Sequence, residues 1–171
     1  NIESIRGKID ITSKKGEGSK FTISLPLTLA IIDGQIIKVG DHRYIVPINS
    51  IVHSFRPEKK QISTVQNKAE MVKTGEDLLG VVRLHKLFDI QDATKEPENA
   101  ILMRVQDDEK SCCLLIDELQ GQQQVVIKSL RGVLKSVKGV SGAAIMGDGK
   151  VSLILDIPGL VELAQETNKG N

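Results

Sequence analysis

Short runs of Ile, Val and Leu alternate along this chain with polar stretches and turn-forming residues. Such runs, rich in β-branched residues and bounded by Gly, Asp or Asn, are typical of strands in sandwiches and barrels. The connectors Gly40-Asp41 and Gly147-Asp148-Gly149 favour tight hairpins, because glycine readily adopts positive φ angles. The pattern therefore predicts an all-β fold, with strands at residues 8–12, 21–25, 35–39, 44–48, 71–74, 79–84, 100–105, 112–116, 124–127, 143–146 and 151–155.

Few segments carry helical signals. Residues 1–6 are predicted to be the last turns of a helix that ends at Gly7, and residues 85–90 and 129–137 are predicted to form short turns. Residues 156–164 predict a closing helix, since Pro158 falls within its first turn, where proline is tolerated. The polar tail beyond this helix is expected to fray.

The chain after residue 30 carries an internal duplication. Residues 36–51 resemble residues 102–119 as strand, turn and strand, and residues 82–88 resemble residues 155–161 as an apolar strand ending in a helical turn. A repeat of only two units predicts twin small barrels packed together rather than a solenoid. We therefore expect a Gly-, Lys- and Ser-rich opening at 1–30, two barrels at about 31–98 and 99–165, and a polar tail at 166–171.

Composition excludes several classes of function. Aromatic residues make up 2% of the chain and the net charge is +1. This leaves neither the stacking platforms nor the basic surface that nucleic-acid binding requires. No apolar run reaches the roughly 20 residues needed to cross a bilayer, and no signal peptide is visible. We expect a cytoplasmic protein with no nucleic-acid partner and no direct membrane insertion.

Recognisable catalytic and metal-binding motifs are missing from the sequence. The histidines, His42, His53 and His85, are isolated from one another and from the cysteines, so neither a metal site nor a nucleophile–base pair is predicted. Cys112 and Cys113 are neighbours in a predicted strand and point to opposite faces, so we expect reduced thiols rather than a disulfide. The sequence predicts no enzymatic activity, no metal and no cofactor for this chain.

Several segments nevertheless resemble known families. Residues 1–11 followed by residues 16–26 resemble the end of a histidine-kinase ATP-binding domain, in which a helix leads to a strand, a Gly-rich box and a strand that closes on Leu-Pro. Residues 39–48, 125–130 and 141–156 are similar to CheW and to the regulatory domain of chemotaxis histidine kinases of the CheA type. The last segment is the most distinctive. The resemblance covers essentially the whole chain apart from its polar tail.

The resemblance implies two SH3-like, five-stranded β-barrels related by pseudo-twofold symmetry, with few short helices. The implied role is regulatory and scaffolding: the domain binds the adaptor CheW and chemoreceptor signalling tips within the parent kinase dimer, at membrane receptor arrays. Each candidate contact residue has a core position as its alternative, because most apolar strand residues lie inside. The candidates are Ile36, Val39, Tyr44, Ile48, Ile145 and Leu153.

Gly16, Gly18 and Ser19 match the last Gly-rich box of the ATP-binding domain; taken alone, they predict only a flexible loop between two strands. The resemblance implies ATP and Mg²⁺ for the intact parent kinase. We expect this chain to bind no ATP, because one box cannot assemble a phosphoryl-transfer site. We also expect the strands of residues 1–30 to pack on a neighbouring molecule or to be mobile, since an isolated hairpin is marginal in water.

Two other interpretations stay open. A free-standing adaptor of the CheW type explains residues 31–165 equally well but leaves the kinase-like residues 1–30 unexplained. A small-ligand-binding or enzymatic β-barrel predicts a concave pocket with converging polar groups, whereas a scaffold predicts filled barrels with apolar edges.

Overall fold

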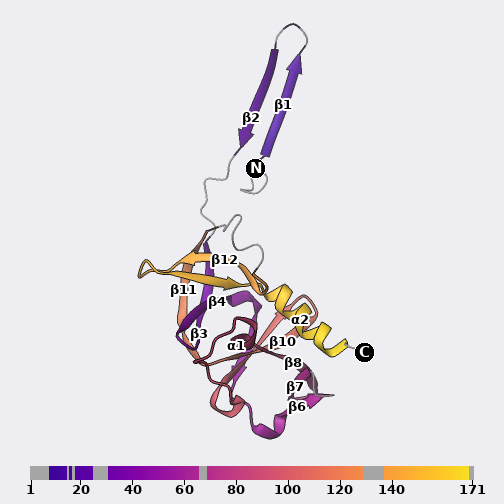
Figure 1. The fold of residues 1–171 in the computed structure, drawn as a ribbon. Coiled ribbons are helices and arrows are strands. Elements are labelled where there is room, and N and C mark those ends of the chain that lie inside the picture. Colours follow the sequence, from indigo (N-terminus) through magenta and orange to yellow (C-terminus); the bar gives the residue numbers. More distant parts are fainter. Residues whose placement is uncertain are drawn as a thin grey trace. The chain divides into compact units, whose positions relative to one another are not determined.

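The computed structural model describes residues 8–14, 16, 18–24, 31–65, 69–128 and 137–169 (Figure 1). The chain divides into two units, Asn1–Ala30 and Ile31–Asn171. In the first unit, β1 (Lys8–Lys14) and β2 (Gly18–Ser24) form an antiparallel hairpin. The helix predicted at residues 1–6 and most of the turn predicted at 129–137 lie outside the described residues.

Five strands of the second unit close into a barrel, which we call the barrel lobe. Around the barrel the order is β11, β12, β13, β4 and β3, and β3 pairs again with β11. All neighbours are antiparallel except β13 and β4, which run parallel. The strands are β3 (Ile31–Val39), β4 (His42–Pro47), β11 (Glu118–Lys128), β12 (Val140–Ile145) and β13 (Val151–Leu155).

The other six strands of this unit form a second sheet, which we call the sheet lobe. Its order is β5, β9, β10, β8, β7 and β6, and only β10 and β8 run parallel. The strands are β5 (Ile51–Phe55), β6 (Ile62–Val65), β7 (Ala69–Thr74), β8 (Asp77–Arg83), β9 (Ile101–Asp107) and β10 (Lys110–Ile116).

The two lobes have the same pairing scheme, and each lobe contains strands from both halves of the chain. In the barrel lobe, β4 of the β3–β4 hairpin pairs in parallel with β13, and β12 and β11 follow β13 in the strand order. In the sheet lobe, β10 of the β9–β10 hairpin pairs in parallel with β8, and β7 and β6 follow β8. The predicted duplication agrees with this scheme. The boundary predicted near residue 98 does not separate the lobes, because each hairpin shares its lobe with strands from the other half of the chain, an exchange that the sequence left open.

The lobes differ in how they close. In the barrel lobe the single long strand β11 pairs with β3 and then with β12. In the sheet lobe two short strands fill these roles, β5 beside β9 and β6 beside β7. Pro57, which has no N–H to donate, and the 3₁₀ turn η3 (Lys59–Gln61) separate them. The second of the predicted five-stranded barrels is therefore a six-stranded sheet.

Opposite faces of the central strands enter different cores. Ile36 points into the barrel lobe, whereas Ile37 packs between the two lobes. Cys112 likewise lies between the lobes, and Cys113 lies inside the sheet lobe. Because both faces are buried, β10 contains the continuous apolar run Cys112–Ile116, and β3 contains the adjacent apolar pair Ile36 and Ile37. Both cysteines are free and buried, on opposite faces of their strand as predicted.

Two helices complete the second unit. α1 (Leu84–Leu87) follows β8, and α2 (Ile157–Lys169) forms the C-terminal end of the described chain (Figure 1). α2 packs against β8, β9 and β10. α2 continues through most of the tail that was predicted to fray, since Leu160, Val161 and Ala164 anchor it in the core. The sequence prediction also missed β5 and β6, whose apolar residues are interrupted by polar ones such as His53 and Ser63.

Candidate functional site

One end of the barrel lobe carries a surface that we call the barrel rim. The rim is formed where the β3–β4 turn, the β12–β13 turn and the middle of β11 meet. Two cavities of ≈ 460 Å³ and ≈ 380 Å³ open on it and are both lined by Arg43 and Met146. The first also contacts Ile36 and two glutamines of β11, and the second contacts Tyr44 and the start of β13.

Local sequence determines the shape of the β12–β13 turn. The backbone N–H of Met146 donates to the carbonyl of Lys150 at 2.7 Å, and the N–H of Gly149 donates to the carbonyl of Met146 at 2.9 Å. Gly149 has a φ of +80°, which a side chain would strain. Asp148 Oδ1 accepts a hydrogen bond from the N–H of Lys150 at 3.0 Å. The turn is therefore closed by its own backbone and holds Asp148 at the rim.

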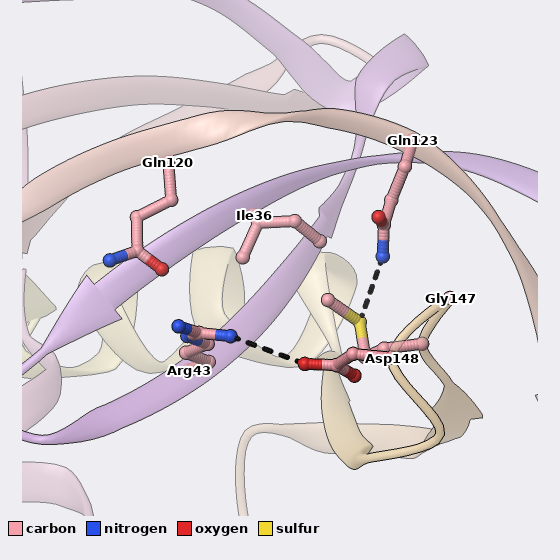
Figure 2. A pocket seen from close by; sticks show the side chains of 7 residues that line it. Ile36, Arg43, Gln120, Gln123, Gly147 and Asp148 are labelled. Atoms are coloured by element: carbon pink, nitrogen blue, oxygen red, sulfur yellow. Dashed lines mark hydrogen bonds and ion pairs between the residues drawn. The ribbon is translucent and has the colours of Figure 1, made fainter.

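Polar side chains surround the first cavity (Figure 2). Arg43 Nη1 lies 3.6 Å from Asp148 Oδ2, and Gln123 Nε2 donates to Met146 Sδ at 3.2 Å. The two charged side chains are almost half exposed, so their ion pair is screened by water and contributes at most about 1 kcal/mol to stability. The arrangement presents a guanidinium, a carboxylate and amide groups to a partner molecule.

The same end of the barrel lobe carries exposed apolar side chains, of which Val151 lines the second cavity. Ile145 and Val151 are direct cross-strand partners, so their side chains share one face of the β12–β13 hairpin. They are 41% and 66% exposed, although both are β-branched and apolar. An exposed apolar pair bordered by charged groups is the arrangement found at protein–protein interfaces, where an apolar centre has a polar edge.

Four of the six predicted contact residues meet at the rim. Ile36 lines the first cavity, Tyr44 and Leu153 line the second, and Ile145 belongs to the exposed pair. The sequence prediction missed Val151, although it directly follows the Gly-Lys end of the predicted turn and was therefore a clear candidate to face Ile145 across the hairpin.

The other two predicted residues lie elsewhere. Val39 is 1% exposed in the core between the lobes, so its side chain cannot contact a partner of the folded domain. Ile48 borders a third cavity of ≈ 710 Å³ at the opposite end of the barrel lobe. Tyr44 is also largely buried, with its ring stacked on Phe88, and burial raises the pKa of its hydroxyl. Tyr44 therefore forms part of the wall of the second cavity and exposes little surface to a partner.

The predicted nucleotide-binding residues belong to the first unit. Gly16 and Gly18 have φ angles of +86° and +99° at the β1–β2 turn, and the Oγ atoms of Ser19 and Ser13 are 2.9 Å apart. The positive φ angles explain why glycine occupies both positions. The nucleotide-binding role of these three residues in a parent protein stays a prediction.

Cys112 and Cys113 are both buried. Burial raises the pKa of both cysteine thiols to about 12, which makes them poor nucleophiles. Within the described ranges, no three His, Cys, Asp or Glu side chains are placed to hold a metal ion. None of the helices in the described part of the chain is long and apolar enough to cross a membrane.

Two β-lobes that exchange strands, with a rim of mixed apolar and polar character, have the surface composition of a protein-recognition module. The family model of the CheW-like domain matches residues 33–165. The chain belongs to the CheW-like domain family. This family is a regulatory and scaffolding fold without catalytic activity, in agreement with the class inferred from the sequence.

Similar proteins agree with this assignment. The chain is 36% identical over 166 residues to chemotaxis protein CheA of Klebsiella aerogenes, covering 97% of this chain and 26% of that protein. It is 38% identical over 166 residues to CheA of Treponema pallidum, covering 95% and 20%. The chain thus spans about a quarter or less of the length of these curated relatives and corresponds to the CheW-like region of CheA proteins.

A solved structure shows the same fold. The scaffolding protein TtCheW from Thermoanaerobacter tengcongensis superposes with a TM-score of 0.59 at 16% identity, over 73% of this chain and 88% of that one. The prediction of an all-β, SH3-like fold of the CheW type is thereby confirmed. The comparisons also connect the chain to protein–protein interaction in chemotaxis signalling.

Proposed function

We propose that this chain is the regulatory domain of a chemotaxis histidine kinase and that it binds a CheW-type adaptor and chemoreceptor tips. In this role it couples receptor state to kinase activity in the cytoplasm, at membrane receptor arrays, within a kinase dimer. The observation that carries the proposal is the exposed pair Ile145 and Val151 beside the Arg43–Asp148 ion pair. Covering the apolar centre of such a surface with a protein partner removes it from water and therefore favours binding.

Residues 1–30 support a kinase as the parent protein. The alignment to the Klebsiella aerogenes CheA covers 97% of this chain, so it must include most of these residues as well as the CheW-like domain. We propose that they are the C-terminal remnant of an ATP-binding domain. Ile11 and Phe21 are cross-strand partners on one face of the hairpin and are 63% and 66% exposed. A parent sheet or domain that covers this face would explain why both are apolar.

The binding test uses the chain with a purified CheW protein and, separately, with a receptor tip fragment. Isothermal titration should detect binding to each. Replacing the exposed pair in Ile145→Ser and Val151→Ser variants should weaken adaptor binding about tenfold each, because burying a Val or Ile side chain contributes about 1.5 kcal/mol or more.

Leu78→Ser is the matched control, because Leu78 is 56% exposed and lies on β8 of the sheet lobe, away from the rim. It should leave adaptor binding unchanged. Equal losses in all three variants, or wild-type affinity in both rim variants, would exclude the rim as the adaptor site. Circular dichroism should first establish that each variant is folded.

A free-standing CheW-type adaptor is the second candidate, because the chain superposes on most of the length of TtCheW. Sequencing the gene upstream of the codon for Asn1 separates the two. Boxes of an ATP-binding domain encoded there favour the kinase, and a start codon with no such boxes favours the adaptor.

A further inference from the structure

A loop that leaves the sheet lobe holds the β3–β4 turn at the barrel rim. Residues 88–95 run from the end of α1 towards the 3₁₀ turn η4 (Pro97–Asn99). Asp92 Oδ2 accepts a hydrogen bond from the backbone N–H of Asp41 at 2.8 Å. A Cβ atom added to Gly40 would stand 2.6 Å from both Asp92 and Ile90, so the loop touches the turn directly. Gly40 also has a φ of +58°, a left-handed conformation that favours glycine on its own account.

One further carboxylate joins the turn and the loop. Asp117, between β10 and β11, accepts the N–H of Gly40 with Oδ2 at 2.8 Å and the N–H of Thr94 with Oδ1 at 3.1 Å. Its own N–H donates to the carbonyl of Lys38 at 2.9 Å. Hydrogen bonds to a carboxylate are stronger than those between neutral groups. Asp117 therefore bridges the turn to the loop from a third segment of the chain.

An aromatic contact extends this link to the second rim cavity. The rings of Phe88, at the start of the loop, and Tyr44 are stacked with centroids 4.9 Å apart and an angle of 14°. Tyr44 lines the cavity and is the partner of Leu153, where β4 and β13 run parallel. Two residue pairs define that parallel contact. Phe88 of the loop therefore contacts one lining residue of the cavity, Tyr44, which pairs with a second, Leu153.

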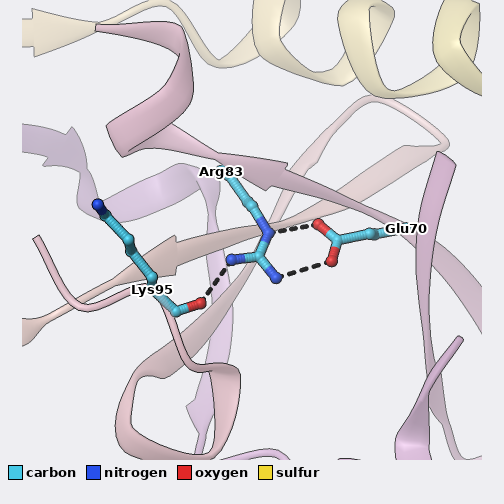
Figure 3. Close-up of polar contacts among 3 residues, drawn as sticks. All are labelled: Glu70, Arg83 and Lys95. Carbon is cyan, nitrogen blue, oxygen red and sulfur yellow. Dashed lines mark hydrogen bonds and ion pairs between the residues drawn. The ribbon is translucent and has the colours of Figure 1, made fainter. Parts of the chain in front are cut away.

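The other end of the loop is anchored in the sheet lobe (Figure 3). Arg83 of β8 donates from Nη1 to the carbonyl of Lys95 at 2.6 Å. Its Nε and Nη2 atoms donate to the two carboxylate oxygens of Glu70 on β7, with 2.7 Å between Nη2 and Oε1. Both side chains are mostly buried. This bidentate geometry orients the guanidinium rigidly, so the end of the loop follows β7 and β8.

We propose that residues 88–95 couple the sheet lobe to the barrel rim and that Asp92 and Asp117 are positioning residues for adaptor binding. The inference rests on the proposed function of the rim. A partner that holds or loosens β7 and β8 changes how firmly the β3–β4 turn is held, and adaptor binding at the rim stabilises the loop in return. Through the hydrogen bonds of this loop, each lobe influences the other without a change of fold.

Amide hydrogen exchange of the chain alone tests the coupling. Asp92→Ala should speed exchange at the amide of Asp41, and Asp117→Ala at the amides of Gly40 and Thr94, about fivefold or more, because each amide loses a charged acceptor. Asp92→Asn keeps an acceptor oxygen and should restore most of the protection. Amides of β10 serve as the internal standard, and they should be unchanged if the variants open only locally.

The decisive comparison involves two Arg–carboxylate pairs of the sheet lobe. Glu70→Gln weakens the anchor of the loop, whereas Asp77→Asn weakens the Arg104–Asp77 pair, whose atoms Nη1 and Oδ2 are 2.8 Å apart and which does not touch the loop. Glu70→Gln should speed exchange at Gly40 and Asp41 at least twofold, and Asp77→Asn should not. Equal effects of the two variants, or no effect of either, overturn the coupling.

Titration with a purified CheW protein separates the two proposals. Asp92→Ala should weaken adaptor binding about threefold or more, and Asp92→Asn should restore it. If the adaptor binds the wild-type chain and the Asp92→Ala variant equally, Asp92 is not a positioning residue and this inference fails, while the proposed function stands. If the wild-type chain binds no adaptor, the proposed function fails, and the exchange comparison still decides whether the lobes are coupled.

Discussion

A single glycine inside the barrel lobe tests whether the barrel is filled. Gly34 on β3 is buried, and a Cβ atom at this position would stand 2.5 Å from Cγ2 of Ile45 on β4. The next atoms, on Gln123 and Val125, are 3.8 Å away, which is ordinary contact. Ile45 is fully buried, so its methyl group has no room to retreat. Gly34→Ala therefore forces a displacement of about 1 Å in a packed interior.

The expected loss of stability follows from that overlap. Overpacking a core costs about 1–3 kcal/mol, and replacing glycine returns about 0.4–1 kcal/mol by restricting the unfolded chain. The net loss of about 1–2 kcal/mol should lower the urea midpoint by about 0.5–1 M, given a slope of about 2 kcal/mol/M. Equilibrium unfolding followed by circular dichroism measures this shift.

A double-mutant cycle assigns the loss to the clash. Leucine carries no methyl group on Cβ, so Ile45→Leu removes Cγ2 at nearly constant volume and should itself cost less than about 1.5 kcal/mol. In the double variant the two losses should overlap by about 1 kcal/mol. Strict additivity would show that Cγ2 of Ile45 is not the obstacle. A Gly34→Ala protein as stable as the parent would mean spare space inside the barrel and would favour the ligand-binding alternative.

Two further predictions concern titratable groups. Hydrogen bonding to Arg83 lowers the pKa of Glu70 below its ordinary value of 4.5, so its stabilising contribution is present above that pH and is lost as the pH falls through the lowered folded-state pKa. The urea midpoint of Glu70→Gln should therefore lie below that of the parent at pH 7, and the difference should shrink as the pH falls below 4.5; a constant difference would contradict this assignment. Burial raises the pKa of both Cys112 and Cys113 to about 12, so neither thiol of the folded chain should react with iodoacetamide at about pH 8. Both should react once urea unfolds the chain, and mass spectrometry measures the labelling. Rapid labelling of the folded chain would show that the strand β10 opens readily.

The local pattern was sufficient for most of the strands and for the class of fold. Ile/Val/Leu runs bounded by Gly-Asp turns identified most strands, and the resemblance around residues 141–156 indicated the family. The same turn, with its glycines, placed Ile145 near an exposed hairpin end. These features depend on neighbours in sequence, through backbone preferences at Gly149 and side-chain direction along a strand.

Only the tertiary structure decided which strands pair. Alternation of side chains tells which face a residue belongs to, but not which strand lies beside it, and in β3 and β10 both faces are apolar because each serves two cores. The boundary predicted near residue 98 therefore does not separate the lobes, and Val39, a contact candidate with a core position as its alternative, lies between the lobes. The rim joins segments that are distant in sequence, since Arg43, Gln123 and Val151 meet only after the halves of the chain have exchanged strands. Such long-range pairing depends on packing summed over the whole domain, which no local pattern records.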